Sequence, residues 1–524
     1  MPAEKGQTVA WLPDLLYTGG RFERGLALVC DAAGHIVKIA GAGELSDEKK
    51  VHLSNRAMLP GMINAHSHAF QRVLRGRTEF SGELLSSGGS PTLNGADSFW
   101  TWREMMYSAA THLTPEDIYE ASRMAFLEMA LSGITAVGEF HYLHHAPDGV
   151  PYDDPNLLAT EVVRAARDVG LRIALLRVAY ARSGYQTEAN PKQQRFIERD
   201  SATYLKNLER LIADVTRGTS PTVRAGSSSA AKGGALPDGR ANAPHAAAWA
   251  GVAPHSVRAV PLDYLREVVA YANEHQLKIH MHVAEQPAEV SACVEEYGRT
   301  PIALLDTEGL LSERFTAVHA IHVTPKAIPS LARAGASVCA CPTTERNLGD
   351  GVVPADEYFE HGVTVCLGTD SHAQIDLLED ARELEYHLRL QKLERAVLDC
   401  GDPTVREGAF ADEIEKSTLP NGRVSAIARR LFECATVNGA RSIGASGGVL
   451  EAGKPADFFT VALDDPTIAG ASSDNLLSSI VFASTRAAVR EVVVGGKPIV
   501  SAGQHLIQDD VIERFNDLQK RLWS

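Results

Sequence analysis

The sequence has few cysteines, no long apolar run and no excess of basic residues, and each shortage excludes a class of protein. Seven cysteines in 524 residues, an odd number lying mostly in apolar segments, favour reduced, buried thiols in a cytosolic protein over a disulfide framework. No run of about 18 apolar residues occurs, so no membrane span is expected. The net charge of −15, without any basic cluster, argues against a nucleic-acid partner. The N-terminus has no basic segment followed by an apolar one, so no signal peptide is expected.

The length suits one large catalytic domain and a smaller one. Both ends of the chain consist of short apolar runs broken by glycine, proline and aspartate, a texture typical of β-strands. We therefore expect residues 1–58 and 445–524 to build one small β-sandwich domain, and residues 59–444 to form the catalytic domain. Two stretches rich in glycine, serine, alanine and proline, 81–97 and 226–248, are expected to be flexible inserts.

Between these ends, eight apolar runs that each finish in polar residues alternate with helical patterns. Such alternation predicts a parallel (β/α)8 barrel of the TIM type. The clearest helix begins after Thr114, a suitable N-cap, with Pro115 in its first position, and ends at Gly133. In barrels of this kind the chemistry lies at the C-terminal ends of the strands. Histidine, glutamate, aspartate and arginine gather at those ends in this sequence.

Four of these strand ends offer metal ligands or proton carriers. His66 and His68 stand two residues apart, so both imidazoles point to the same side of the first strand and can reach one ion. His282 lies nearer the end of the fifth strand than His280, which favours His282 as the ligand. Asp370 follows the eighth strand, where a carboxylate suits either metal ligation or activation of a water.

The remaining candidates each have an ordinary alternative. Glu285, just beyond the fifth strand, could move a proton, although taken alone it would suit a solvated loop carboxylate. His319 ends the sixth strand, while His322 is expected to be structural. His372 suits either support of a ligand or the surface. Taken together, the histidines and carboxylates at the ends of strands one, five, six and eight are an arrangement that chance would rarely produce.

Six motifs identify a family resemblance. They are NAHSHAFQR (64–72), DSFWTWREMMY (97–107), GEFHYLHH (138–145), APHSVRAV (253–260), HVAEQ (282–286) and GTDSH (369–373). The chain resembles the amidohydrolase superfamily and, within its branch of deaminases that use one metal, it is similar to the formimidoylglutamate deiminases. The resemblance covers nearly the whole chain apart from the two inserts.

The resemblance implies a role for each matching residue. The implied metal ligands are His66, His68, His282 and Asp370. The implied catalytic groups are His319, the proton shuttle Glu285, and Asp370. The implied substrate-binding residues are Gln71, Arg103, Tyr142, His255 and Arg258. The family also implies one zinc ion per chain, with another divalent metal as the alternative, a homodimer and a cytoplasmic location.

The chemistry of these residues agrees with such a substrate. A formimino group is an amidine, cationic near pH 7, which a carboxylate such as Glu285 can pair with, and its carbon can be attacked by a metal-activated water. Arg103 and Arg258 offer planar forks for two carboxylates. We therefore expect hydrolysis of N-formimino-L-glutamate, a small dicarboxylate, to N-formyl-L-glutamate and ammonia, a step of histidine degradation.

Two other functions stay open. The nearer one is another single-metal deaminase acting on a guanine-like or adenosine-like ring, whose site should offer aromatic stacking in place of paired arginines. The remote one is a non-catalytic barrel that serves as a binding module, a class that usually loses its metal ligands.

Overall fold

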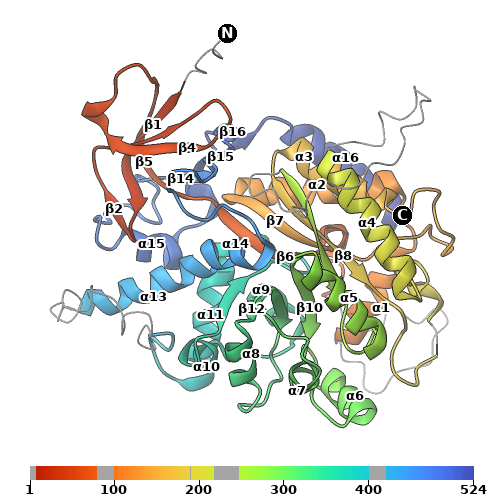
Figure 1. Cartoon of the computed structure of the whole chain (residues 1–524). Coiled ribbons are helices and arrows are strands. Elements are labelled where there is room, and N and C mark those ends of the chain that lie inside the picture. Colours follow the sequence, from red (N-terminus) through yellow and green to blue (C-terminus); the bar gives the residue numbers. More distant parts are fainter. Residues whose placement is uncertain (1–7, 80–98, 189, 218–246, 400–419) are drawn as a thin grey trace.

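The computed structural model describes residues 8–79, 99–188, 190–217, 247–399 and 420–524. The insert expected at 81–97 therefore lies outside the described residues, as does the insert at 226–248 except for its last two positions. Two sheets organise the described chain, one a barrel and the other built from segments of both ends (Figure 1).

The barrel has eight parallel strands, as the alternating pattern predicted. In sheet order, which is also chain order, they are β6 (Met62–Ser67), β7 (Ile134–His141), β8 (Arg172–Ala179), β9 (Ala248–Pro254), β10 (Ile279–Val283), β11 (Phe315–His319), β12 (Ser337–Ala340) and β13 (Thr364–Leu367). A bridge between Ser67 and Asp370 joins the first strand to the last and closes the ring. The amides of Thr369 and Asp370 donate to the carbonyl of His66 at 3.0 and 3.1 Å. The barrel therefore closes at residues that the sequence analysis assigned to the site.

Helices surround the barrel. They are α1 (Phe99–Ala110), α2 (Pro115–Leu131), α3 (Leu157–Val169), α4 (Ser201–Arg217), α5 (Leu262–Glu274), α6 (Pro287–Tyr297), α7 (Pro301–Thr307), α8 (Ile328–Ala334), α9 (Pro342–Leu348), α10 (Ala355–Glu360), α11 (Leu377–Lys392), α13 (Pro420–Cys434) and α14 (Val437–Ile443). Helix α2 begins with the predicted cap: Thr114 and Asp117 form a reciprocal capping box, with Pro115 in the first turn. Helix α8 begins at Ile328 and has Pro329 in its first turn, where the missing amide hydrogen costs no helical hydrogen bond.

The second sheet has nine strands from both ends of the chain, which confirms the predicted sandwich-like domain (Figure 1). Its strands are β1 (Val9–Thr18), β2 (Arg21–Glu23), β3 (Leu26–Cys30), β4 (Ile36–Gly41), β5 (Lys49–Pro60), β14 (Phe458–Ala462), β15 (Val489–Val494), β16 (Lys497–Ser501) and β17 (Gln504–His505). Strand β5 is central, because it pairs with β1 in parallel and with β14 in antiparallel orientation. The core of this domain joins the two ends directly: the rings of Trp11 and Phe458 meet edge to face, 5.3 Å apart.

Two helices lie within the C-terminal range that was expected to be β-structure. Helix α15 (Leu476–Ala483) packs on α11 and α13, and α16 (Gln508–Trp523) leaves the sheet and packs on α2 of the barrel. The buried face of α16 carries Val511, Phe515 and Leu518, at the spacing of an amphipathic helix. The strand-rich texture of the preceding residues concealed this helical period.

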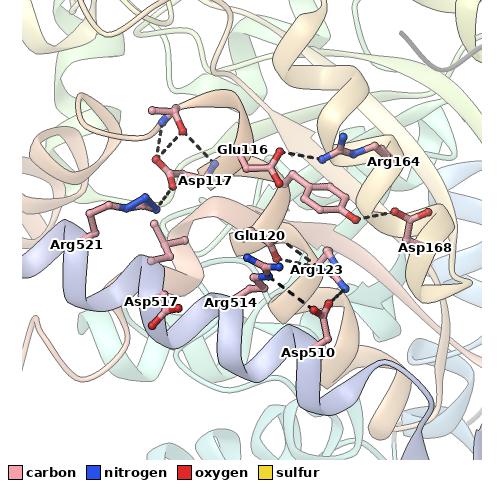
Figure 2. Close-up of a pocket in the computed structure, with 13 residues that line it drawn as sticks. Glu116, Asp117, Glu120, Arg123, Arg164, Asp168, Asp510, Arg514, Asp517 and Arg521 are labelled. Carbon is pink, nitrogen blue, oxygen red and sulfur yellow. Dashed lines mark hydrogen bonds and ion pairs between the residues drawn. The ribbon is translucent and has the colours of Figure 1, made fainter. Parts of the chain in front are cut away.

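Ion pairs complete the contact between α16 and α2. Arg123 reaches Asp510 at 2.6 Å and Arg521 reaches Asp117 at 2.5 Å. Figure 2 shows these pairs around a hollow of about 740 Å³ between α2, α3 and α16. Its charged side chains largely neutralise one another, so the hollow is a docking seam of the protein's own last helix.

Within the described part of the chain, every helix is too short or too polar to cross a bilayer.

Candidate metal centre and substrate pocket

Four side chains converge at the mouth of the barrel and form what we call the ligand cluster: His66, His68, His282 and Asp370. One Asp370 oxygen lies 3.1 Å from Nε2 of His66 and 3.1 Å from Nε2 of His68. Nε2 of His68 lies 3.2 Å from that of His66 and 3.4 Å from that of His282. Four ligands at about 2.0–2.1 Å around a tetrahedral ion stand roughly 3.3 Å apart, so these spacings suit one such ion.

The surroundings of the cluster hold it in the protonation state that a metal needs. Nδ1 of His68 donates to the Phe140 carbonyl at 2.9 Å, which leaves the lone pair of Nε2 facing the cluster. Burial lowers the pKa of His66 to about 3 and lowers the pKa of His282 well below its usual value, so both imidazoles stay neutral. Burial would raise the pKa of Asp370, but its contacts with His66 and His68 hold it well below the usual range. Neutral imidazoles beside a carboxylate form a donor set that fits a divalent metal.

His319 and Glu285 lie beside the cluster, as the sequence analysis expected. Nδ1 of His319 faces Glu345 at 3.2 Å, and its Nε2 lies 3.6 Å from Glu285. This Nε2 is buried, and within the described chain it has no hydrogen-bond partner. Burial would lower the pKa of His319, but Glu285, Glu345 and Asp370 raise it to about 10. Burial raises the pKa of Glu285, so this carboxyl group is protonated more readily than an exposed one.

Glu345 is a functional neighbour that the sequence analysis missed. Its Oε1 faces His319 and also accepts the backbone amide of Cys341 at 2.9 Å. His319, Cys341 and Glu345 are close enough to hold a metal of their own. However, burial raises the pKa of Cys341 well above its usual value and keeps it a thiol. We therefore interpret this trio as a support that orients His319.

The backbone at the barrel mouth adopts left-handed conformations that residues with side chains rarely take. The φ angles are +53° at Ala284, +66° at His319, +50° at Ala320, +42° at Asp370 and +62° at His372. Such strain persists only where the surrounding structure enforces it, and it is concentrated at functional sites. Here it follows three strand ends that carry candidate site residues.

A hydrogen-bonded network supports the seam where β6 meets β13. His372 is fully buried, so the surface alternative for it is wrong. Its two ring nitrogens lie 3.1 Å from the hydroxyls of Ser67 and Thr369. Ser67 also donates to Glu139 at 2.5 Å, and burial raises the pKa of Glu139 to about 7. The network fixes the backbone that carries His66, His68 and Asp370.

One pocket opens onto the ligand cluster and contains all five residues expected to bind substrate. Its lining is His68, Gln71, Phe99, Trp102, Arg103, Met106, Tyr107, Tyr142, Tyr180, Phe196, His255, Arg258, His282, Glu285, Leu348 and Asp370. Gln71 donates to the hydroxyl of Tyr142 at 2.7 Å, and its side-chain carbonyl oxygen is buried with no partner in the described parts of the chain. The pocket therefore joins the predicted recognition residues to the predicted reaction centre.

Arg103 and Arg258 make one end of this pocket positive. Nε and Nη1 of Arg103 are buried and have no hydrogen-bond partner among the residues that the structure describes, and its guanidinium carbon lies 4.3 Å from the centre of the Trp100 ring. Burial lowers the pKa of Arg103, and Arg258 lowers it further. Arg258 makes one hydrogen bond from Nη1, to the Ser183 carbonyl at 3.2 Å. Two guanidinium groups with free donors form an end of the pocket suited to an anion.

Tyr107 and Tyr180 also line the pocket, and the sequence analysis did not assign them. Tyr107 follows Arg103 by four residues on α1, so helical spacing could have indicated it. Tyr180 directly follows β8, and the rule that favours strand ends could have indicated it as well.

The chain can now be compared with known proteins. The sequence model of the amidohydrolase family matches residues 57–499. A formimidoylglutamate deiminase of Pseudomonas aeruginosa is 36% identical over 450 residues, which cover 86% of this chain and 86% of that protein. A 5-methylthioadenosine/S-adenosylhomocysteine deaminase of Haloarcula marismortui is 26% identical over 97% of this chain and 95% of its own.

Among solved structures, an amidohydrolase from Brucella melitensis is 30% identical, with a TM-score of 0.78 over 99% of this chain and 100% of that one. The family match spans the barrel and the C-terminal strands β14 and β15 of the sandwich-like domain, so it covers the closed ring, the ligand cluster and the pocket described above. The chain therefore belongs to the amidohydrolase family and is a hydrolase that acts on a carbon–nitrogen bond.

Proposed function

We propose that the enzyme hydrolyses N-formimino-L-glutamate to N-formyl-L-glutamate and ammonia, a reaction of histidine degradation. The observation that carries the proposal is the pair of arginines, Arg103 and Arg258, at the end of a pocket that opens onto the ligand cluster. The relative from Pseudomonas aeruginosa with this named activity supports it.

The substrate offers groups that complement each part of the pocket. Its two carboxylates suit the donors of Arg103 and Arg258, assisted by His255 and Tyr142. Its cationic amidine suits the carboxylate of Glu285, which lies near the ligand cluster. In this orientation the amidine carbon faces the cluster and the glutamate moiety fills the positive end.

We infer that the cluster holds one zinc ion, because three imidazoles and one carboxylate suit zinc better than the oxygen-preferring cations. A divalent ion held there would lower the pKa of a water molecule and polarise it for attack. In our proposal, His319, protonated at neutral pH and held at Nδ1 by Glu345, orients that water, and Asp370 takes up its proton. The Glu285 carboxylate receives this proton and passes it to the amidine nitrogen, so that the tetrahedral intermediate expels ammonia.

A purine-like ring is the competing substrate, since relatives that deaminate purine compounds are 26% identical or a little more. The pocket does contain aromatic side chains, including Trp102 and Phe196. A neutral ring, however, would leave the donors of Arg103 buried and unpaired, which costs about 1–3 kcal/mol or more for each such group.

An ammonia-release assay separates the two candidates. Purified enzyme should be offered N-formimino-L-glutamate, N-formimino-glycine, a guanidino acid, adenosine and guanine at equal concentrations. We expect the highest kcat/KM for the dicarboxylate. A purine turned over faster than the formimino compounds would refute the proposal.

We further propose a homodimer and a cytoplasmic location, as the family resemblance implies. Analytical ultracentrifugation tests the first and fractionation of the source cells tests the second.

A further inference from the structure

Gln193 lies behind the positive end of the pocket and contacts both tyrosines there. It ends the short 3₁₀ helix η4 (Pro191–Gln193) and is 1% exposed. Its side-chain Nε2 donates to the hydroxyl of Tyr107 at 2.7 Å and to that of Tyr180 at 2.9 Å. An amide nitrogen carries two hydrogens, so both are used on these two hydroxyls.

The orientation of this amide is set by a neighbour. The hydroxyl of Ser183 accepts the backbone amide of Asn190 at 3.0 Å, and it donates its own proton to Oε1 of Gln193. In this orientation the oxygen of the amide faces Ser183 and the nitrogen faces the tyrosines.

The consequence concerns the hydroxyl protons of Tyr107 and Tyr180. Each hydroxyl oxygen accepts from Gln193, so neither hydroxyl proton is used on the amide. The two hydroxyls lie beside each other, and a substrate oxygen in the pocket can accept their protons. Burial raises the pKa of Tyr107, which keeps its proton in place. Tyr107 and Tyr180 are 3% and 1% exposed, so bulk water does not compete for those donors.

The pocket end then holds four side chains that can donate hydrogen bonds: Tyr107, Tyr180, Arg103 and Arg258. Arg103 contributes two unpartnered N–H groups, and Arg258 lies beside Tyr180. A lining of donors without a fixed acceptor favours a carboxylate over a neutral amide, because an amide would bring N–H groups against other donors.

We propose that Gln193 is a positioning residue that turns the hydroxyls of Tyr107 and Tyr180 into donors for one substrate carboxylate. The inference rests on the proposed function. It adds that Gln193 makes the positive end of the pocket select a carboxylate over a neutral group. Gln193 acts through the tyrosines and touches no reacting atom.

The test is Gln193→Glu, which keeps the shape and reverses the polarity. A carboxylate at this position accepts both tyrosine protons and places a negative charge behind the subsite. We expect KM for N-formimino-L-glutamate to rise about tenfold to hundredfold and kcat to change less than about threefold, because the lost contacts hold the substrate and do not move protons. The Kd of the product N-formyl-L-glutamate, measured by titration calorimetry, should rise by the same factor.

Two substrate analogues show whether Tyr107 and Tyr180 bind one particular carboxylate of the substrate. N-formimino-4-aminobutyrate lacks the α-carboxylate and N-formimino-2-aminobutyrate lacks the γ-carboxylate. For one of them the penalty of Gln193→Glu should disappear. Adding Tyr107→Phe to Gln193→Glu should cost little more than Gln193→Glu alone, because the same hydroxyl is already lost to the substrate.

Tyr204→Phe is the matched control, because the Tyr204 hydroxyl is fully buried and donates to the Arg177 carbonyl away from the pocket. It should lower stability and leave KM unchanged. A Gln193→Glu enzyme with wild-type KM and product affinity, or with equal penalties on all three substrates, overturns the inference alone. A wild-type enzyme that releases no ammonia from N-formimino-L-glutamate overturns both this inference and the proposed function.

Discussion

Replacement of Arg103 by methionine tests the carboxylate subsite most directly. Methionine keeps an apolar stem of similar length and removes the guanidinium, which lies over the Trp100 ring. Because Nε and Nη1 of Arg103 have no protein partner, the change breaks no hydrogen bond among the described residues. The loss should therefore be confined to the substrate.

The expected loss follows from the geometry. A buried, charge-assisted fork is worth about 2–4 kcal/mol when its partner is left desolvated, which corresponds to about 30- to 900-fold in kcat/KM. Arg103→Lys should recover only a small part, because an ammonium group cannot make two parallel hydrogen bonds.

Steady-state ammonia release on N-formimino-L-glutamate and on its two mono-carboxylate analogues measures the effect, and metal content should stay at the wild-type level. Arg164→Met is the control, since Arg164 pairs with Glu116 on the outer face of α2 and α3 (Figure 2). If Arg103→Met costs the same on all three substrates, or costs less than threefold on the dicarboxylate, the argument for a carboxylate at this position is wrong.

Three more predictions concern the metal, the proton carriers and acid stability. Elemental analysis should find about one divalent ion per chain, zinc before others, and two stoichiometric ions would contradict a single tetrahedral cluster. His319→Asn and Glu285→Gln should keep the metal but lower kcat by about 10²–10⁴, since each group orients or moves a proton; near-normal kcat in either variant would refute its role. Burial alone would raise the pKa of Glu198 above its usual value of 4.5. Its hydrogen bonds with Arg177, the longer of them 2.8 Å, and with other donors lower the pKa to about 2 instead. A lowered folded-state pKa stabilises the protein above pH 4.5, by roughly 3 kcal/mol, and this contribution disappears as the pH falls from 4.5 to 2. Glu198→Gln should thus melt below the wild type at pH 7, and the gap in melting temperature should close toward pH 2; a gap that does not change with pH would disprove the assignment.

The sequence predicted the barrel well because parallel strands buried on both faces leave a strong signal. Each of the eight apolar runs became a strand. His66 and His68 could be paired from their spacing alone, since residues two apart share one face of a strand. Convergence with Asp370, some 300 residues away, depended on the ring closing at Ser67.

Other features had no signal of this kind. Gln193 lies in a short 3₁₀ turn, and its importance comes from two hydroxyls that only the folded chain brings to it. Glu345 sits in the first turn of α9, where an acidic residue is ordinary. Helix α16 was missed because its apolar period begins only after a strand-rich region, and its partner α2 lies almost 400 residues earlier.

The central place of β5 imposes an order on folding during synthesis. Strand β5 finds β1 at once, but its other edge waits for β14, whose residues follow about 400 positions later, or roughly 20–80 s at ordinary ribosomal speed. Throughout that interval one edge of β5 is unpaired. Met58 and Leu59 lie on this strand, and both are fully buried in the finished protein. The barrel waits as well, because β6 has no closing partner until β13 emerges. A chain released before β13 and β14 have emerged would therefore have neither sheet complete, so production of this enzyme should depend strongly on chaperones that shield early strands.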